Sequence, residues 1–157
     1  MPANLSWNEI HARAVVFQSR WAGESSEDAE AKSFWNDFFQ IFGMDRRRVA
    51  SFETRVKLLE GKQGKIDCFW PGVLLIEHKS LGKDLDAAFA QAIGYFDGLK
   101  SRELPKYVLV SDFARFRFYD IDERTHVEFP IEELSQNVKQ FGFIAGYTQQ
   151  KLREQDP

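Results

Sequence analysis

The sequence predicts an α/β fold in a single domain, and three observations support this class. The 157 residues are 43% hydrophobic and 15% aromatic, which is enough apolar material for one sizeable core. Apolar residues recur at helical spacing in several segments, and short runs of β-branched and aromatic residues lie between them. Helical and extended segments are interspersed along the chain, an order typical of a mixed sheet flanked by helices.

Two helices are expected before the first strand. Residues 5–22 place apolar side chains at spacings of three and four. The run ESSEDAEAKSFWNDFFQIFG, residues 24–43, carries an aromatic stripe and ends at Gly43, a residue type that commonly terminates helices.

The remaining elements form a meander followed by mixed helices and strands. Strands are expected at residues 49–60, 64–70 and 73–79, joined by the turn signals EGKQG and Pro71-Gly72. The later elements are a helix over 84–100, strands over 105–112 and 115–121, and a closing helix over 131–141. We expect one domain over 1–157, with an ordered core at about 5–146 and a polar, fraying tail at 147–157.

Charge and cysteine content limit the classes of function. The formal net charge of −3 excludes a uniformly basic coat for nucleic acid, but the charge is unevenly distributed. Residues 46–83 contain nine Lys or Arg and four acids, and two further acids, Asp45 and Asp84, lie directly outside this range and reduce the contrast. A lone cysteine, Cys68, cannot form an internal disulfide, and no apolar run reaches membrane-spanning length, so a cytoplasmic protein is expected.

An acidic pair stands out in GKIDCFWPGVLLIEHKS, residues 64–80. Side chains alternate along a strand, so Glu77 and Lys79 share one face and His78 lies on the other. If Trp70-Pro71-Gly72 reverses the chain, Asp67 lies across from Glu77. An arbitrary Glu-x-Lys is usually a solvated strand end. Here four aliphatic residues, 73–76, come directly before Glu77, and this favours a functional site.

Two carboxylates and an ammonium at one place suit phosphodiester hydrolysis. Asp67 and Glu77, completed by water and the backbone carbonyl of His78, are ligands typical of Mg²⁺, with Mn²⁺ as a substitute. Such an ion activates water and stabilises charge on a phosphate under attack. Lys79 is expected to align or help deprotonate that water.

These residues match a known pattern. Ile66-Asp67, a nine-residue spacer and Glu77-His78-Lys79 resemble the PD-(D/E)XK nuclease signature, with isoleucine where the proline would stand. Gln91 and Tyr95, four apart on the next predicted helix, resemble the QxxxY element of restriction nucleases. With EAKSFWNDFFQIFG, RRRVASFE, GVLLIEHKSLGKDLDAAFAQAIGYF and YVLVSDFARFRFYD, the chain resembles the amino-terminal nuclease domain of MmeI-like, single-chain (type IIG or IIL) restriction-modification enzymes over residues 5–145.

The resemblance implies a restriction-endonuclease-like mixed sheet and further site residues. Glu30 would support the metal, and Glu27 is the alternative residue for this role. Glu30 could instead only stabilise the first turn of the helix, where an acid interacts favourably with the helix dipole. Gln91 would support catalysis. The residues expected to contact DNA are Arg46, Arg47, Arg48, Lys83 and Tyr95, although an arginine run is more often a solvated turn.

The resemblance also implies partners. Full-length relatives continue into a methyltransferase domain, which binds S-adenosylmethionine, and a target-recognition domain. No methyltransferase motif occurs here, so no S-adenosylmethionine is expected in this chain, which is interpreted as an excised domain or truncated product. The expected partners are double-stranded DNA and those missing domains, with dimerisation on DNA and no membrane.

Two other functions stay open at this point. The chain could be a nuclease fold that only binds DNA or a partner, but all three signature side chains are intact. It could also be a stand-alone nuclease for branched or damaged DNA.

Overall fold

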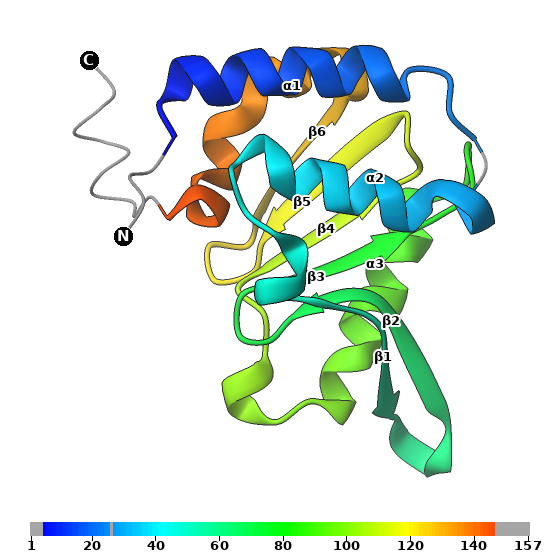
Figure 1. Ribbon diagram of the computed structural model, residues 1–157. Helices are drawn as coiled ribbons and strands as arrows, with labels where there is room; N and C mark the ends of the chain where they lie inside the picture. Colours follow the sequence, from blue (N-terminus) through cyan, green and yellow to red (C-terminus); the bar gives the residue numbers. More distant parts are fainter. Residues whose placement is uncertain (1–4, 26, 147–157) are drawn as a thin grey trace.

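A computed structural model describes residues 5–25 and 27–146, in which a six-stranded sheet lies between two helical layers (Figure 1). The fold class expected from the sequence, a mixed sheet flanked by helices, is confirmed. The expected polar tail, residues 147–157, lies outside the described residues. Among the described residues, none of the helices is both long and apolar enough to cross a membrane.

The chain begins with two antiparallel helices that cover one face of the sheet. Helix α1, Trp7–Trp21, starts at Ser6, whose hydroxyl accepts a hydrogen bond from the Glu9 amide at 3.1 Å. Helix α2, Glu27–Ile41, turns its aromatic stripe toward the sheet. The helical spacing in the sequence is therefore the spacing of the buried side chains.

The sheet follows chain order, β1 to β6, and contains one parallel pair. The strands are β1 (Ser51–Lys57), β2 (Gln63–Trp70), β3 (Leu74–His78), β4 (Tyr107–Ser111), β5 (Arg115–Asp120) and β6 (Thr125–Pro130). All neighbours are antiparallel except β3 and β4. A parallel connection needs a crossover, and α3 (Leu85–Gly94) with the 3₁₀ turns η3 (Tyr95–Gly98) and η4 (Ser101–Glu103) supplies it.

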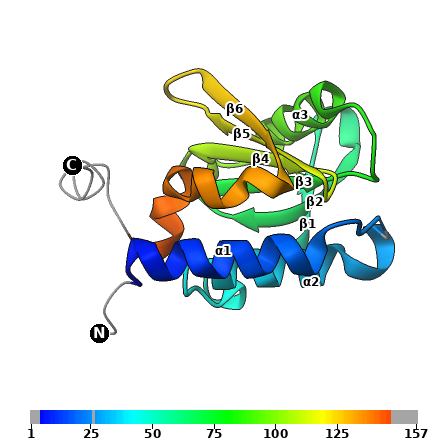
Figure 2. The same cartoon turned by 90° about the horizontal axis from the view of Figure 1, so that it is seen from above.

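Two hydrophobic cores lie on the two faces of the sheet. Figure 2 shows from above that α1 and α2 lie on one side of the strands and α3 on the other. The larger core packs α1, α2 and the closing helix η5 (Ile131–Ala145) against one face. The smaller core packs α3 against the other face and includes Ile66, Leu75 and Tyr95. Strand β3 is buried along its whole length because both faces are covered.

The structure differs from the predicted elements in four places. Strand β6 was not predicted. The helix expected over 84–100 ends at Gly94 and continues as a 3₁₀ turn, whereas the closing helix runs to Ala145 and ends at Gly146 with φ of 87°. The first strand is shorter than 49–60, with the 3₁₀ turns η1 (Arg46–Arg48) before it and η2 (Leu59–Gly61) after it.

Candidate active site

The register of the β2–β3 hairpin sets the geometry of the site. Cys68 pairs with Ile76 and Phe69 with Leu75, so one further step along this antiparallel register places Asp67 across from Glu77. Both carboxyl groups line an open cavity of about 560 Å³, which we call the carboxylate cavity. Its other lining residues are Leu58, Gln63, Gly64, Lys65, His78, Lys79, Gln91, Gly94 and Tyr95.

Glu77 is the most unusual group in the carboxylate cavity. Glu77 is only 2% exposed, and its Oε1 is buried without a hydrogen-bond partner among the described residues. Its Oε2 lies 3.4 Å from both Lys79 Nζ and the Tyr95 hydroxyl. Burial, and then the negative charge of Asp67, raise the pKa of Glu77 to about 8, and Lys79 only partly opposes this.

A chain of hydrogen bonds connects Lys79 to helix α3. Lys79 Nζ donates to Gln91 Oε1, and Gln91 Nε2 donates to the Tyr95 hydroxyl at 2.9 Å. That hydroxyl lies 2.9 Å from the backbone carbonyl of Lys65, to which it can donate. Burial and the charge of Glu77 raise the pKa of Tyr95 to about 12, so the phenol stays protonated and can donate.

Gly64 makes room for this network. A Cβ atom at Gly64 would lie 2.7 Å from Tyr95 Cε1, so the tyrosine ring packs directly on the glycine backbone. The sequence gives no reason to single out Gly64, which stands in the turn-like run EGKQG, where a glycine is unremarkable. Only the three-dimensional approach of α3 shows its role.

The backbone of His78 belongs to the site, whereas its ring belongs to the core. Its backbone amide donates to Asp67 Oδ2 at 2.8 Å, which fixes one carboxylate oxygen. Its ring is buried in the aromatic core, where Trp35 Nε1 donates to Nδ1 at 3.0 Å. Burial lowers the pKa of His78 to about 4, so the ring is neutral. The backbone carbonyl of His78 stays the predicted metal ligand.

The donor set fits a hard divalent cation. Mg²⁺ takes one or two carboxylates and keeps several water ligands, so Asp67 and Glu77 are a sufficient protein contribution. The buried, unpartnered Oε1 of Glu77 is the kind of atom that a cation would satisfy. Within the described part of the chain, no group of three or more His, Cys, Asp or Glu side chains is arranged so that all of them could hold one metal ion.

Glu30, expected to support the metal, lies on α2 and is partly buried. A second, smaller cavity adjoins the carboxylate cavity, and Ala31 and Lys32 are among its lining residues. Glu30 is not among the described residues that line either cavity. Its support of the metal stays a prediction.

The expected DNA contacts are distributed over several segments. The guanidinium group of Arg46 is held by contacts within the chain. Its Nε donates to Asn36 at 2.9 Å, its Nη1 donates to the Ala50 carbonyl at 2.7 Å, and it lies 3.9 Å from the Phe52 ring centroid. Arg47 pairs with Asp45, and Arg48 is exposed.

The other two expected DNA contacts lie in different surroundings. Lys83 is exposed on the loop after β3. Tyr95 is 4% exposed and belongs to the carboxylate cavity, so the structure brings it together with Asp67, Glu77, Lys79 and Gln91. Arg46, Arg47, Arg48 and Lys83 are not among the described residues that line this cavity.

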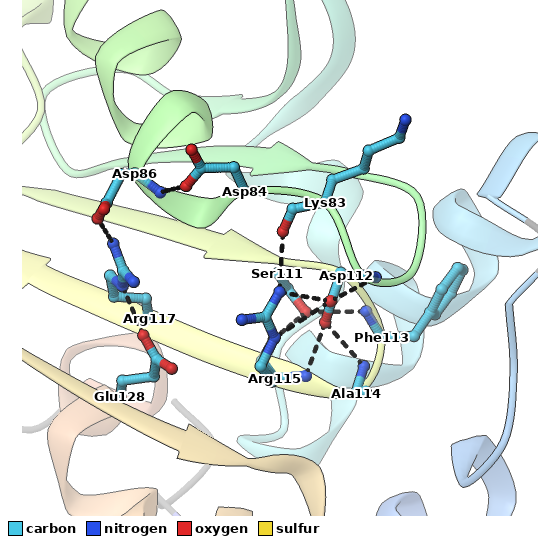
Figure 3. A network of polar contacts seen from close by, with 11 residues as sticks. Lys83, Asp84, Asp86, Ser111, Asp112, Phe113, Ala114, Arg115, Arg117 and Glu128 are labelled. Carbon is cyan, nitrogen blue, oxygen red and sulfur yellow. Dashed lines mark hydrogen bonds and ion pairs between the residues drawn. The ribbon is translucent and has the colours of Figure 1, made fainter.

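A buried acid to which no sequence pattern points, Asp112, anchors the loop after Lys79. Asp112 is only 1% exposed. Figure 3 shows it at the centre of a polar network at the end of β4. Its carboxylate accepts from the Gly82 amide at 3.0 Å and from Arg115 Nη2 at 2.9 Å, and the same Nη2 donates to the Lys83 carbonyl at 2.8 Å. The loop that leads from Lys79 to α3 is therefore fixed at two points.

The start of α3 is anchored in a similar way. Arg117 on β5 pairs with Asp86 on α3 and with Glu128 on β6, as Figure 3 also shows. Phe89 stacks on Tyr119 with ring centroids 3.7 Å apart. These contacts hold the helix that carries Gln91 and Tyr95 in a fixed position over the sheet.

Comparisons with known proteins agree with this architecture. A chain of the cryo-electron microscopy structure of a DrdV–DNA complex has the same fold with a TM-score of 0.55, at 11% sequence identity over 91% of this chain. The match covers 14% of the DrdV chain, so this chain spans a small part of that protein. No curated protein sequence matches significantly. The family model described as "MmeI, N-terminal domain" matches residues 12–157, and the chain therefore belongs to this family of MmeI amino-terminal domains.

Proposed function

We propose that this chain is the DNA-cleaving module of a restriction enzyme and hydrolyses phosphodiester bonds with Mg²⁺, or with Mn²⁺ in its place. The observation that carries this proposal is the carboxylate pair, in which Glu77 is buried beside the partly buried Asp67, with one Glu77 oxygen unsatisfied and an ammonium 3.4 Å away. A buried acid whose polar atoms are only partly satisfied is costly, and such perturbed groups in a cavity are typical of functional sites.

Each side chain has a distinct role in this proposal. Asp67 and Glu77 would hold the cation, which when bound supplies Lewis acidity toward the phosphate and a more acidic water. Lys79 orients the attacking water and stabilises the negative charge that builds on the phosphate. Gln91 keeps Lys79 directed at the cavity, and Tyr95 fixes Glu77 by its hydroxyl.

The family and the DrdV structure support DNA as the substrate. The DrdV protein is described in complex with DNA, and the present chain has the fold of one part of it. Because the match covers 14% of that chain, we propose that methyltransferase and target-recognition domains belong to the complete protein. A single site cuts one strand at a time, so we also propose that two copies act together on a duplex.

A calorimetric titration with Mg²⁺ and Mn²⁺ tests the metal site directly. We expect the wild type to bind the cation and both Asp67→Ala and Glu77→Ala to lose binding, whereas Glu103→Ala, at an acid on η4, serves as a matched control that keeps it. Equal binding by all four proteins would remove the metal from this hairpin. Nicking of supercoiled plasmid by the same proteins separates a nuclease from a module that binds the cation but does not cut.

A further inference from the structure

A second cavity adjoins the carboxylate cavity on the side of α2. It measures about 240 Å³, and we call it the lysine cavity. Its lining residues are Ala31, Lys32, Trp35, Phe52, Glu53, Lys65, Asp67 and His78. Three of these, Lys65, Asp67 and His78, also line the carboxylate cavity, so the two cavities meet at the proposed metal ligand Asp67.

Glu53 joins the two lysines of this cavity. Its carboxylate lies 3.5 Å from Lys32 Nζ and 3.8 Å from Lys65 Nζ, and all three side chains are more than half exposed. Exposed ion pairs of this kind contribute little to stability, because water competes for each charge. The lysines can therefore exchange Glu53 for another anion at little cost.

The backbone of Glu53 is also unusual. It has φ of 54°, in the left-handed region that residues with a side chain rarely adopt, although it stands inside strand β1. Such conformations are unfavourable and occur preferentially at ligand sites. Here the conformation accompanies a carboxylate that lies between two ammonium groups beside the proposed catalytic acids.

The two lysines are held from both sides of the cavity. Lys65 is fixed through its backbone carbonyl, which accepts from Tyr95 in the carboxylate cavity. Lys32 Nζ lies 6.0 Å from the centroid of the Phe52 ring, which also carries the guanidinium of Arg46. The basic groups of α2 and η1 therefore both lie close to one aromatic side chain, Phe52, at the edge of the site.

We propose that Lys32 and Lys65 bind a DNA phosphate next to the one held at Asp67 and Glu77, and that Glu53 occupies this phosphate position in the free chain. The inference rests on the proposed function, since it assigns a neighbouring phosphate to the same substrate. A nucleic-acid phosphate replaces Glu53 because its binding releases condensed counterions, which a carboxylate of the same chain cannot do.

Opposite effects of substitutions at the same cluster test this proposal. Binding of a short DNA duplex is followed by fluorescence anisotropy in a buffer with EDTA, so that no cleavage occurs. The double variant Lys32→Gln/Lys65→Gln is expected to bind about tenfold more weakly per lysine at about 50 mM salt, and its salt slope falls by about 2. Glu53→Gln is expected to bind several-fold more tightly, because the lysines lose their internal competitor.

A matched control has the same change of charge at a distant place. Lys100→Gln/Lys106→Gln removes two exposed lysines from the segment that leads into the amino end of β4, whereas the site lies at the carboxyl end of β3. This control is expected to keep the wild-type salt slope, and thermal unfolding of every variant verifies folding. Weaker binding by Glu53→Gln, or a double variant that matches the control, would overturn the inference.

The outcome can be separated from that of the proposed function. Cation binding at Asp67 and Glu77 is measured by calorimetry without DNA and does not involve Lys32 or Glu53. A chain that binds the cation and cuts DNA, but whose double variant keeps the wild-type affinity and salt slope, would contradict only the lysine proposal. A wild-type chain that does not bind the duplex at low salt would contradict it as well.

Discussion

Replacement of Glu77 by glutamine should change the pH dependence of stability in a defined direction. The folded protein raises the pKa of Glu77 from 4.5 to about 8, so the folded state holds this proton more tightly than the unfolded state does. The stabilisation is therefore complete below the unfolded pKa and is lost as pH rises through about 8. Glutamine keeps the shape of the side chain but does not ionise.

The magnitude follows from the shift. Each pKa unit corresponds to about 1.4 kcal/mol, so the wild type should lose about 4 kcal/mol relative to Glu77→Gln between pH 5 and pH 9. The assay is urea unfolding followed by circular dichroism, in EDTA, at several pH values. Mg²⁺ should restore stability to the wild type at high pH but not to the variant, since binding requires the ionised carboxylate.

A stability difference that does not change with pH would refute this reasoning. It would show that Glu77 is solvated in the folded state, and its burial beside Asp67 would then no longer support a cation site. Glu103→Gln, at an acid on η4 whose Oε1 accepts from the Lys100 amide, is the matched control for this change of a carboxyl to an amide.

Three further predictions concern the surroundings of the pair. Lys79→Met should lower the rate of DNA cleavage by about 10²–10³-fold while the fold is retained, as measured by plasmid nicking; an unchanged rate would exclude Lys79 from catalysis. Trp35→Phe should lower the free energy of unfolding by about 1–3 kcal/mol, because the buried Nδ1 of His78 loses its donor; a neutral effect in urea unfolding would contradict this. Burial alone would raise the pKa of Asp112, but the hydrogen bonds from Gly82 and Arg115 lower it, so the wild type should lose stability as pH falls below 3.8. Asp112→Asn should lose less stability over the same pH range, and amide exchange at Gly82 should become faster because its acceptor is changed.

The central part of the site followed from the sequence because strand geometry is regular. Alternation placed Glu77 and Lys79 on one face, and the Pro71-Gly72 turn placed Asp67 on the neighbouring strand, as the register of β2 and β3 now shows. Gln91 and Tyr95 were found only through the family resemblance. Their bonds to Lys79 and Glu77 depend on where α3 crosses the sheet, which no local pattern specifies.

Other features depended on tertiary contacts that the sequence does not display. Strand β6 was missed because only Val127 and Phe129 of its six residues point inward between exposed polar neighbours. The helix expected to reach residue 100 ends early, and Gly98 lies so close to β1 that a Cβ there would be 2.3 Å from the Lys57 carbonyl. Asp112 gave no sign of its burial, since a Ser-Asp pair after a strand usually marks an ordinary turn.

The ends of the sheet limit how two copies of the chain could associate. β1 and β6 are its outermost strands, and both expose charged or polar side chains, among them Arg55 and Lys57 on one and His126 and Glu128 on the other. Charged outer strands discourage backbone pairing between molecules, and the left-handed backbone at Glu53 further interrupts the straight edge of β1. A continuous intermolecular sheet is therefore disfavoured, and cooperation between copies on a duplex would have to use helical or loop surfaces instead.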